Sequence, residues 1–382
     1  MNETTESPFP VVLQVLPALD GGGVERGTVE VTQAITRAGG TALVASAGGR
    51  LVPSVLRAGG RHFTLKLDTK NPWRLWRNAA ALAELIRDER VDIVHARSRA
   101  PAWSAWFAAQ RTGVHFVTTY HAPYGEQVML KRRYNAIMAQ GEIVIAISNF
   151  VAGLIQRRHG VPASRIRVIP RGVDPAVFDP ARVATDRMAR LAKAWRVEDG
   201  HPTIMLPGRL TRWKGQTVLV EALARMTNRA AHVVLVGSDQ GRAKFSAELS
   251  ALAIRLGVAE RVRMVGHCED MPAALMLSDV VVNPSIEPEG FGRVVIEAQS
   301  MARITIGTDH GGAAETIEHG VTGLRVPPGD AAALAAALDA ALAMSDAART
   351  AMGAAARASV QARYTTAALQ DATIEVYREV LA

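Results

Sequence analysis

The sequence predicts an α/β chain that folds as two domains, each built around a parallel β-sheet. Short apolar runs that read as buried strands alternate with helical stretches, and this alternation occurs in both halves of the chain. The chain has 382 residues, of which 48% are apolar and 5% aromatic, so it is long enough to bury two full cores. The expected class is a doubly wound parallel sheet, present twice, with helices on both faces of each sheet.

The first domain is expected to span residues 1–175. Its predicted strands are short runs rich in Val, Ile and Ala, at 11–16, 42–45, 91–95, 116–119, 143–146 and 166–170. A helix is predicted at 24–37, after a run of three glycines. A second helix is predicted to run towards residue 159 from Ser148, whose hydroxyl is a suitable N-terminal cap.

Residues 174–200 carry two prolines, an amphipathic stretch and mixed charge, which predicts a connection between domains, expected at 176–200. The second domain is expected to span 201–363. Its predicted strands lie at 203–206, 233–236, 262–265, 280–282 and 304–306. A last helix is expected at about 366–381, within a separate C-terminal segment, 364–382.

Composition disfavours several classes of protein. Cys268 is the single cysteine, which excludes an internal disulfide framework and fits a small buried residue. No stretch of about 18 apolar residues occurs, so we expect no membrane span. Residues 1–10 are polar and acidic rather than typical of a signal peptide, and we expect a cytoplasmic protein. No His, Cys or Asp cluster has metal-ligand spacing, so we expect no metal site.

The excess positive charge lies in the first half of the chain. Residues 1–180 hold 22 Lys+Arg against 14 Asp+Glu, whereas residues 181–382 hold 22 of each. This asymmetry indicates an anionic partner, and the lack of a nucleic-acid module favours a membrane surface or a phosphorylated acceptor. One basic cluster is Lys-Arg-Arg at 131–133. The other surrounds two tryptophans and comprises Lys66, Lys70, Trp73, Arg74, Trp76 and Arg77.

Basic residues interleaved with tryptophan are typical of a surface that touches anionic lipid headgroups. In the alternative interpretation, the helix face is merely solvated and the tryptophans pack inward.

The segment 284–297 carries the most specific signal. Glu289 and Glu297 lie eight positions apart and flank a Gly-Phe-Gly turn. Prolines and glycines block regular structure before Phe291, and the apolar spacing from Arg293 onward predicts a helix. Glu289 should therefore lie on a loop and Glu297 one turn inside the helix. A helix N-terminus suits phosphate and ionised carboxylates suit sugar hydroxyls, so the segment predicts a nucleotide-sugar site.

A second motif follows the first strand of the second domain. Gly208 begins the string Gly-Arg-Leu-Thr-Arg-Trp-Lys-Gly, in which Arg209 and Lys214 stand five positions apart. Ligands of open parallel sheets bind beyond the carboxyl ends of strands, and both cations suit phosphate. The motif therefore predicts a site for a diphosphate.

Together, these motifs resemble those of retaining glycosyltransferases of the GT-B fold, specifically family 4. The string Pro-Ser-x-Glu-x-Glu-Gly-Phe-Gly-x-Val-x-x-Glu-Ala at 284–298 carries most of the resemblance. It implies two Rossmann-like domains that face a cleft, with the segment 364–382 crossing back to the first domain. It also implies that the chain transfers a hexose from a nucleotide diphosphate sugar, with retention and without a catalytic metal or a further cofactor.

The resemblance also implies roles for individual residues. Arg209 and Lys214 would hold the diphosphate, Glu289 would orient the sugar hydroxyls, Glu297 would bind the ribose and His121 would face the donor sugar. The implied catalytic residues are His121, Glu289, Arg209 and Lys214. The implied donor-binding residues are Gly22, Gly23, Arg209, Lys214, Glu289, Gly290, Phe291, Gly292, Arg293, Val294 and Glu297.

Three further matches are looser. The string at 169–174 fits a family hinge, except that Arg171 replaces the usual Asn, which leaves its role open. The loop at 309–315 fits a family Gly-Gly-x-x-Glu segment, in which Glu315 is a candidate structural residue. His95, at the end of a predicted strand, is a weaker candidate for acceptor contact.

The sequence of the chain resembles bacterial enzymes of lipopolysaccharide or other surface-glycan assembly. The resemblance includes the strings Gly-Gly-Val-Glu-Arg-Gly-Thr-Val-Glu at 22–30 and His-Ala-Arg-Ser-Arg-Ala-Pro-Ala-Trp at 95–103. With the basic first half, this implies a peripheral protein at the inner face of the cytoplasmic membrane, with GDP-mannose or a UDP-hexose as donor. Two alternatives stay open at this point. One is an epimerase of the same fold that converts a nucleotide sugar, and the other is a non-catalytic protein that binds one.

Overall fold

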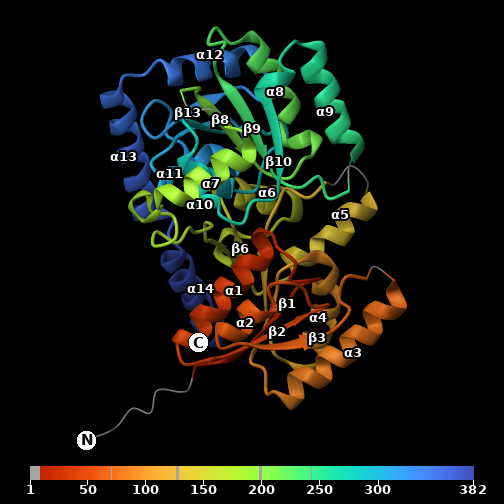
Figure 1. Cartoon of the computed structure of the whole chain (residues 1–382). Coiled ribbons are helices and arrows are strands. Elements are labelled where there is room, and N and C mark those ends of the chain that lie inside the picture. The colour runs from red at the N-terminus through yellow and green to blue at the C-terminus, as the bar shows by residue number, and fades with distance from the viewer. Residues whose placement is uncertain (1–8, 70, 126–128, 198–199, 242) are drawn as a thin grey trace, which may run out of the picture. The chain divides into compact units, whose positions relative to one another are not determined.

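The computed structural model describes residues 9–69, 71–125, 129–197, 200–241 and 243–382 (Figure 1). The N-terminal segment 1–8, Lys70 and residues 198–199, which carried expectations from the sequence, lie outside this range. The chain divides into two compact units. Unit 1 comprises Met1–Arg171 and Thr366–Ala382, and unit 2 comprises Gly172–Thr365. Each unit holds one parallel sheet, which confirms the predicted fold class.

Unit 1 contains a seven-stranded sheet in which every described pairing is parallel. In order across the sheet, its strands are β3 (Arg61–Thr64), β2 (Thr41–Ser46), β1 (Val11–Val15), β4 (Ile93–Ala96), β5 (His115–Tyr120), β6 (Ile143–Ala146) and β7 (Ile166–Val168). Every residue of β4 and β6 is buried. Because successive side chains point to opposite faces, both faces of this sheet are covered.

The helices of unit 1 follow the strands in alternation. They are α1 (Gly23–Arg37), α2 (Val52–Arg57), α3 (Pro72–Asp88), α4 (Arg99–Thr112), α5 (Met129–Asn135), α6 (Asn149–His159) and α14 (Thr366–Leu381), with the 3-10 helices η1 (Ala136–Ala139) and η2 (Ala163–Arg165). The predicted cap is present, since the Ser148 hydroxyl accepts a hydrogen bond from the amide of Val151. The C-terminal helix α14 packs against α1, and its Tyr377 is fully buried.

Unit 2 contains a six-stranded parallel sheet. In order across the sheet, its strands are β10 (Val262–Gly266), β9 (His232–Val236), β8 (Thr203–Pro207), β11 (Val280–Asn283), β12 (Ile304–Thr308) and β13 (Leu324–Val326). Its helices are α7 (Thr185–Trp195), α8 (Gln216–Arg225), α9 (Ala243–Arg255), α10 (Met271–Met276), α11 (Arg293–Ser300), α12 (Ala331–Leu342) and α13 (Asp346–Arg363), with η3 (Pro180–Arg182), η4 (Arg212–Lys214), η5 (Ala259–Arg261) and η6 (Gly312–Thr316).

The segment 176–200, which we expected to connect the domains, contributes a helix to unit 2. Its helix α7 packs against α10. The two are joined by an ion pair in which the Arg187 Nε donates to Oδ2 of Asp270 over 2.8 Å. This part of the chain is therefore held by packing and charge within unit 2.

Within the described ranges, no single helix is long and apolar enough to cross a membrane. The consecutive helices α12 and α13 meet such a test only when they are taken together, and the chain bends by 110° between them.

Candidate active site

The fold of unit 2 places two loops at the point where the strand order reverses. β8 and β11 are neighbours in the middle of the sheet, with β9 on one side and β12 on the other. Ligands of open parallel sheets bind at such a switch point, because the loops beyond the carboxyl ends diverge there. The loops that follow β8 and β11 are residues 208–215 and 284–292. They hold most of the residues predicted to bind the donor.

Lys214 and Glu289 form an ion pair that joins these two loops. The Nζ of Lys214 donates to Oε1 of Glu289 over 2.7 Å, and the two side chains are only 13% and 10% exposed. The same ammonium group lies 4.6 Å from the ring centre of Trp213, which adds a cation–π contact. The structure therefore brings together two of the predicted site residues in a dry environment.

Glu289 is held in its ionised form. Burial by itself would raise the pKa of its carboxyl group. The charge of Lys214 and the hydrogen bonds from Lys214 and Ser285 outweigh burial and hold the pKa below the ordinary value of 4.5. Glu289 is thus a hydrogen-bond acceptor at neutral pH, and its position is fixed by two donors.

Gly215 allows the two loops to approach closely. Its φ is +77°, and a Cβ at this position would lie 1.9 Å from the carbonyl oxygen of Pro284. Beside this contact, the amide of Ile286 donates to the carbonyl of Trp213 over 2.8 Å. No other residue could take the place of Gly215 without separating the loops that carry Lys214 and Glu289.

The predicted Gly-Phe-Gly turn leads into α11 as expected. Gly292 is the N-cap residue and has the left-handed conformation, with φ +82°. A Cβ there would meet the Cβ of Ala313 at 2.7 Å, so the turn also packs closely against η6. The ring of Phe291 is 4% exposed and lies edge-on to Tyr364 with 5.6 Å between ring centres. Phe291 therefore anchors the turn in the core of unit 2, directly after Gly290.

Helix α11 begins at Arg293, which places Glu297 one turn inside it, as predicted. The side chain of Glu297 is buried, and its Oε1 lies 3.2 Å from the Nε of Arg293. Val294 is half-buried at the second position of the helix. No side chain caps the N-terminus of α11 among the described residues, so the amide groups of its first turn are not occupied by a cap.

The loop at 309–315 supports Glu289 from the other side. The amide of Gly312 donates to the carbonyl of Glu289 over 2.8 Å, and the His310 Nε2 lies 2.8 Å from the carbonyl oxygen of Ser285. The backbone carbonyl of Glu315 accepts a hydrogen bond from the hydroxyl of Tyr364 over 3.2 Å. This loop therefore fixes the backbone on which Glu289 stands.

Arg209 lies on the same loop as Lys214, but its side chain is exposed. Its carbonyl accepts a hydrogen bond from the Nε2 of Gln216 over 2.9 Å, which fixes the backbone. Its guanidinium has no hydrogen bond or ion pair with any part of the chain that the structure describes. Arg209 is thus a cation at the mouth of the site rather than a member of the buried pair.

In unit 1, the glycine loop lies between β1 and α1 and leads directly into α1, next to the switch point between β1 and β4. Gly22 is the N-cap residue of α1 and Gly23 is its first residue. The carbonyl of Gly22 accepts a hydrogen bond from the amide of Arg26 over 3.0 Å. The two predicted glycines therefore lie where a backbone can approach a ligand closely.

His121 follows β5 and contacts Arg171, the residue that departs from the family pattern. An Nη of Arg171 donates to Nδ1 of His121. Because a guanidinium can only donate, Nδ1 must be the acceptor and the ring proton must lie on Nε2. Burial, and then the charges of Arg171 and Arg97, hold the pKa of His121 well below 6.5. The Nε2 atom is buried and has no hydrogen-bond partner among the residues described.

Arg97 is a site residue that we did not predict. It follows β4 and is only 1% exposed, and its Nη1 donates to Oε1 of Gln14 over 3.2 Å. Guanidinium nitrogens of Arg97 and Arg171 would lie 2.9 and 2.6 Å from a Cβ at Gly27, on the second turn of α1. Two cations therefore converge on the start of this helix. An arginine directly after a buried strand was the signal that the sequence offered.

His95 is a structural residue of the core. It is fully buried, with its Nδ1 2.7 Å from the hydroxyl of Tyr377 and its Nε2 2.7 Å from the hydroxyl of Thr119. Both ring nitrogens are thus used inside unit 1, where they tie β4 to β5 and to α14.

Comparison with known families separates the two units in the same way as the structure. A family model described as "Glycosyltransferase Family 4" matches residues 21–177. A second model, described as "Glycosyl transferases group 1", matches residues 201–344.

Similar proteins agree with these matches. A D-inositol 3-phosphate glycosyltransferase of Xylanimonas cellulosilytica is 33% identical over 72% of this chain and 70% of its own length. A GDP-mannose-dependent alpha-(1-6)-phosphatidylinositol monomannoside mannosyltransferase of Mycobacterium tuberculosis is 33% identical over 48% of each chain. A crystal structure of a glycosyltransferase from Rickettsia africae superposes with a TM-score of 0.90 at 36% identity, covering 97% of this chain and 98% of that one. The chain therefore belongs to family 4 of the glycosyltransferases and is an enzyme of the GT-B fold.

Proposed function

We propose that this enzyme transfers a hexose from a nucleotide diphosphate sugar, GDP-mannose or a UDP-hexose, to a phosphorylated surface-glycan acceptor, with retention at the anomeric carbon. The observation that carries the donor half of this proposal is the buried Lys214–Glu289 pair at the switch point of unit 2. It combines a cation for phosphate with a carboxylate for sugar hydroxyls in one place.

Lys214, Arg209 and the N-terminus of α11 are suited to the diphosphate. An ammonium group has three donors, so Lys214 can keep its bond to Glu289 while it binds a phosphate oxygen. The planar guanidinium of exposed Arg209 can bind the other phosphate through two parallel hydrogen bonds. Stabilising the nucleoside diphosphate as it leaves lowers the barrier to breaking the glycosidic bond.

Glu289 and Glu297 are suited to the hydroxyls of the donor. Glu289 is ionised and fixed by Ser285 and Lys214, so it can accept from sugar hydroxyls without reorganisation. Glu297 lies buried one turn inside α11, with its Oε1 3.2 Å from the Nε of Arg293, and a carboxylate at this position can accept from the ribose hydroxyls. In this arrangement, the carboxylates orient the donor, and the cations stabilise the negative charge that develops on the leaving diphosphate.

His121 is suited to donate a hydrogen bond rather than to act as a base. Its ring is neutral, its Nδ1 accepts from Arg171, and its proton is on Nε2. A neutral Nε2–H can bind a hydroxyl of the donor sugar. The acceptor proton would then pass to an oxygen of the donor phosphate on the same face of the sugar, a route that gives retention and needs no protein base.

Buried cations in unit 1 favour a phosphorylated acceptor. Arg97 and Arg171 are both buried beside α1, and their guanidinium groups converge near Gly27, an arrangement that suits an anionic ligand. The names of the relatives from Xylanimonas and Mycobacterium also include a phosphate on the acceptor. A lipopolysaccharide core or another surface glycan that carries phosphate has this chemistry.

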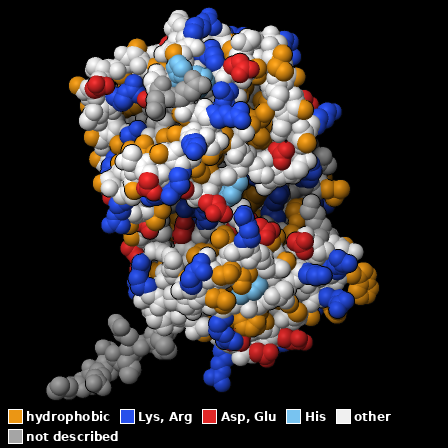
Figure 2. All heavy atoms as spheres, viewed as in Figure 1, with side chains coloured by type: hydrophobic (Ala, Val, Ile, Leu, Met, Phe, Trp, Pro, Cys, Tyr) orange, Lys and Arg blue, Asp and Glu red, His pale blue; other side chains and the backbone are white. Residues whose placement is uncertain are grey.

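The second part of the proposal is that unit 1 docks on the inner face of the cytoplasmic membrane, where the acceptor is found. Trp73 and Trp76 are 76% and 56% exposed on α3, so the alternative in which they pack inward is wrong. Arg74 and Arg77 are exposed beside them. Figure 2 shows hydrophobic side chains bordered by Lys and Arg over the end of α3. Exposed tryptophans among cations suit an anionic lipid interface.

A thermal-shift screen tests the donor half. The purified protein is heated with UDP, GDP, ADP and their common sugar conjugates, beside Lys214→Met and the control Lys244→Met, an exposed lysine on α9. One nucleotide should raise Tm in the wild type and in the control but not in Lys214→Met. A rise that survives in Lys214→Met would contradict the assignment of the diphosphate to this site.

A further inference from the structure

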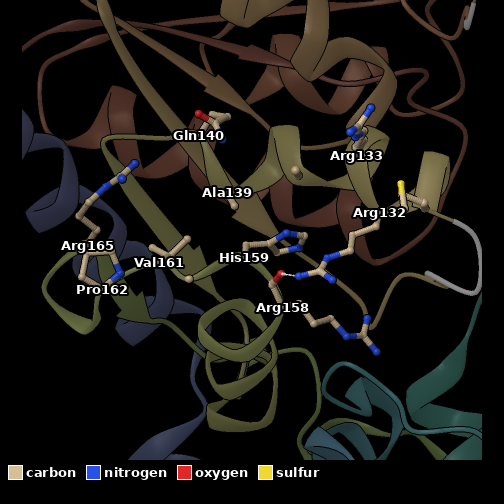
Figure 3. Close-up of a pocket in the computed structure, with 12 residues that line it drawn as sticks. Arg132, Arg133, Ala139, Gln140, Arg158, His159, Val161, Pro162 and Arg165 are labelled. Carbon is tan, nitrogen blue, oxygen red and sulfur yellow. Dashed lines mark hydrogen bonds between the residues drawn. The ribbon is translucent and has the colours of Figure 1, made fainter.

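A basic cavity of about 460 Å³ lies in unit 1, away from the residues discussed so far. It is bounded by α5, by η1 and by the turn that leads from α6 into β7. Figure 3 shows Arg165 on one side of His159, and Arg132 and Arg158 on the other. A cavity of this volume is large enough for a small organic ligand.

The cavity carries several positive charges. The ionisable residues that line it are Arg132, Arg133, Arg158, His159 and Arg165, and none of its described lining residues is acidic. Glu142 is close in sequence, but its carboxylate is used elsewhere. Its oxygens lie 2.9 Å from Nδ1 of His115 and 3.0 Å from the amide nitrogen of Phe116.

Backbone carbonyls hold three of the guanidinium groups in place. Arg132 donates to the carbonyl of Arg158 and Arg158 to that of Tyr124, each over 2.8 Å. Arg165 donates to the carbonyls of Glu142, over 3.1 Å, and Gly141. A carbonyl orients a guanidinium but does not neutralise it, so Arg132 and Arg165 are pre-positioned without an ion pair to any residue that the structure describes.

Arg133 completes the cationic lining. Its guanidinium is exposed, and it has no hydrogen bond or ion pair with the described part of the chain. Beside it, Met129 and Leu130 are 72% and 74% exposed, so an apolar edge adjoins the charged cavity. Cations inside and apolar side chains at the rim match a ligand with an anionic head and an apolar neighbour.

We propose that this cavity is a binding site for a phosphate ester, separate from the sugar-transfer site. Arginines in a fixed arrangement bind phosphate oxygens in pairs, which a diffuse basic surface does not do. The cavity borders the turns into β6 and β7, at their amino ends, because Gln140 and Arg165 precede these strands. His121 and Arg171, in contrast, follow the carboxyl ends of β5 and β7. The phosphate ester is either the headgroup of an anionic lipid or a water-soluble molecule.

Titration of the full-length protein tests this site and separates the two sources. The soluble probe is glycerol 3-phosphate, followed by calorimetry, with glycerol as the uncharged control. The lipid probe is sedimentation with phosphatidylcholine vesicles, with and without phosphatidylglycerol. The variants are Arg133→Gln, which removes no contact within the described chain, and Arg133→Gln/Arg165→Gln. The matched control is Arg57→Gln/Arg87→Gln, which removes the same charge from other surfaces of unit 1.

Binding should weaken roughly tenfold in the double variant and less in Arg133→Gln, while the control stays within about twofold of the wild type. Because α3 can also bind anionic vesicles, only binding that the double variant weakens counts for the cavity. Such binding of glycerol 3-phosphate would identify a soluble ester, and such binding of phosphatidylglycerol vesicles alone would identify a lipid headgroup. Either result supports the site. Equal weakening in the control pair, or no binding of either probe by the wild type, would overturn it.

Discussion

The ammonium group of Lys214 and the carboxylate of Glu289 lie 2.7 Å apart, although the two residues are separated by 75 positions in the sequence. Their bond joins the loops that follow β8 and β11, the two neighbouring strands at the switch point of unit 2. A change at either residue should therefore affect both phosphate binding and the position of the sugar-binding carboxylate.

Loss of Lys214 should destabilise unit 2. Lys214→Met leaves the buried carboxylate of Glu289 without its cation, and we expect the free energy of unfolding to fall by about 3 kcal/mol. Adding Glu289→Gln should restore at least about 1 kcal/mol, because a neutral amide needs no counter-charge. Urea denaturation of the wild type and the two variants measures this. If the double variant is no more stable than Lys214→Met, the unpaired charge of Glu289 is not the cause of the lost stability.

Stability should depend on pH through Glu289. Its folded-state pKa is lowered below 4.5, so its contribution is present above that value and is lost as pH falls through the folded-state value. Between pH 7 and pH 3, the wild type should therefore lose more stability than Glu289→Gln. Denaturation midpoints at several pH values provide the comparison. Equal losses of stability in the wild type and in Glu289→Gln would show that folding does not lower the pKa of Glu289.

Gly215 should be far more sensitive than another glycine of the same conformation. In Gly215→Ala, the Cβ would clash with the carbonyl of Pro284, whereas Gly257→Ala meets open space at φ +69°. We expect Gly257→Ala to cost about 1 kcal/mol, from left-handed strain alone. Gly215→Ala should cost more than about 3 kcal/mol and should abolish the nucleotide-dependent rise in Tm. Similar costs for the two variants would contradict the close approach of the loops.

Arg171 should set the protonation of His121. In the wild type, nitrogen NMR of the labelled ring should show a neutral imidazole with its proton on Nε2 at pH 6.5. Burial and Arg171 are the two largest causes of the lowered pKa. In Arg171→Asn, burial and the charges of Arg97 and His95 remain but the second-largest cause is lost, so the pKa of the ring should rise. An unchanged tautomer and titration curve in Arg171→Asn would mean that Arg171 does not control this ring.

Membrane binding should require the exposed tryptophans of α3. Trp73→Ser/Trp76→Ser should reduce sedimentation with anionic vesicles roughly tenfold, because each indole removes a large apolar surface from the interface. Leu56→Ser, which changes another exposed apolar residue of unit 1, should have little effect. Equal binding of the wild type to neutral and anionic vesicles would count against the electrostatic part of the proposal.

Much of the fold could be predicted because buried parallel strands are short apolar runs. β1, β4, β6, β8 and β11 overlap such runs and were all expected, to within a residue at their carboxyl ends. β3 and β13 were not expected. Both are edge strands, as are β7 and β10, but β7 and β10 lie in short apolar runs around Ile166 and Val262 and were predicted. β3 reads Arg-His-Phe-Thr, and none of its four residues is fully buried. An edge strand is covered by fewer neighbours, so its sequence can lack the apolar run by which other strands are found, as in β3.

The candidate site could be predicted in part, for a similar physical reason. Glu289 and Lys214 stand in local motifs, so their spacing was visible, although their direct contact depends on the strand order. Arg97 and its convergence with Arg171 near Gly27 depend on three separate segments that meet only in the folded unit. No local pattern marks such a cluster, and a single arginine after a strand does not distinguish a buried cation from an exposed one.

The central claim is that Glu289 orients the donor sugar while Lys214 holds its diphosphate. The most direct test compares Glu289→Gln with the wild type in two measurements on the donor that the screen identifies. These are calorimetric binding of the nucleoside diphosphate and its rate of release from the sugar donor. We predict that Glu289→Gln binds the nucleoside diphosphate within about threefold of the wild type but releases it from the donor roughly a hundredfold more slowly. Release at the wild-type rate by this variant would contradict the account.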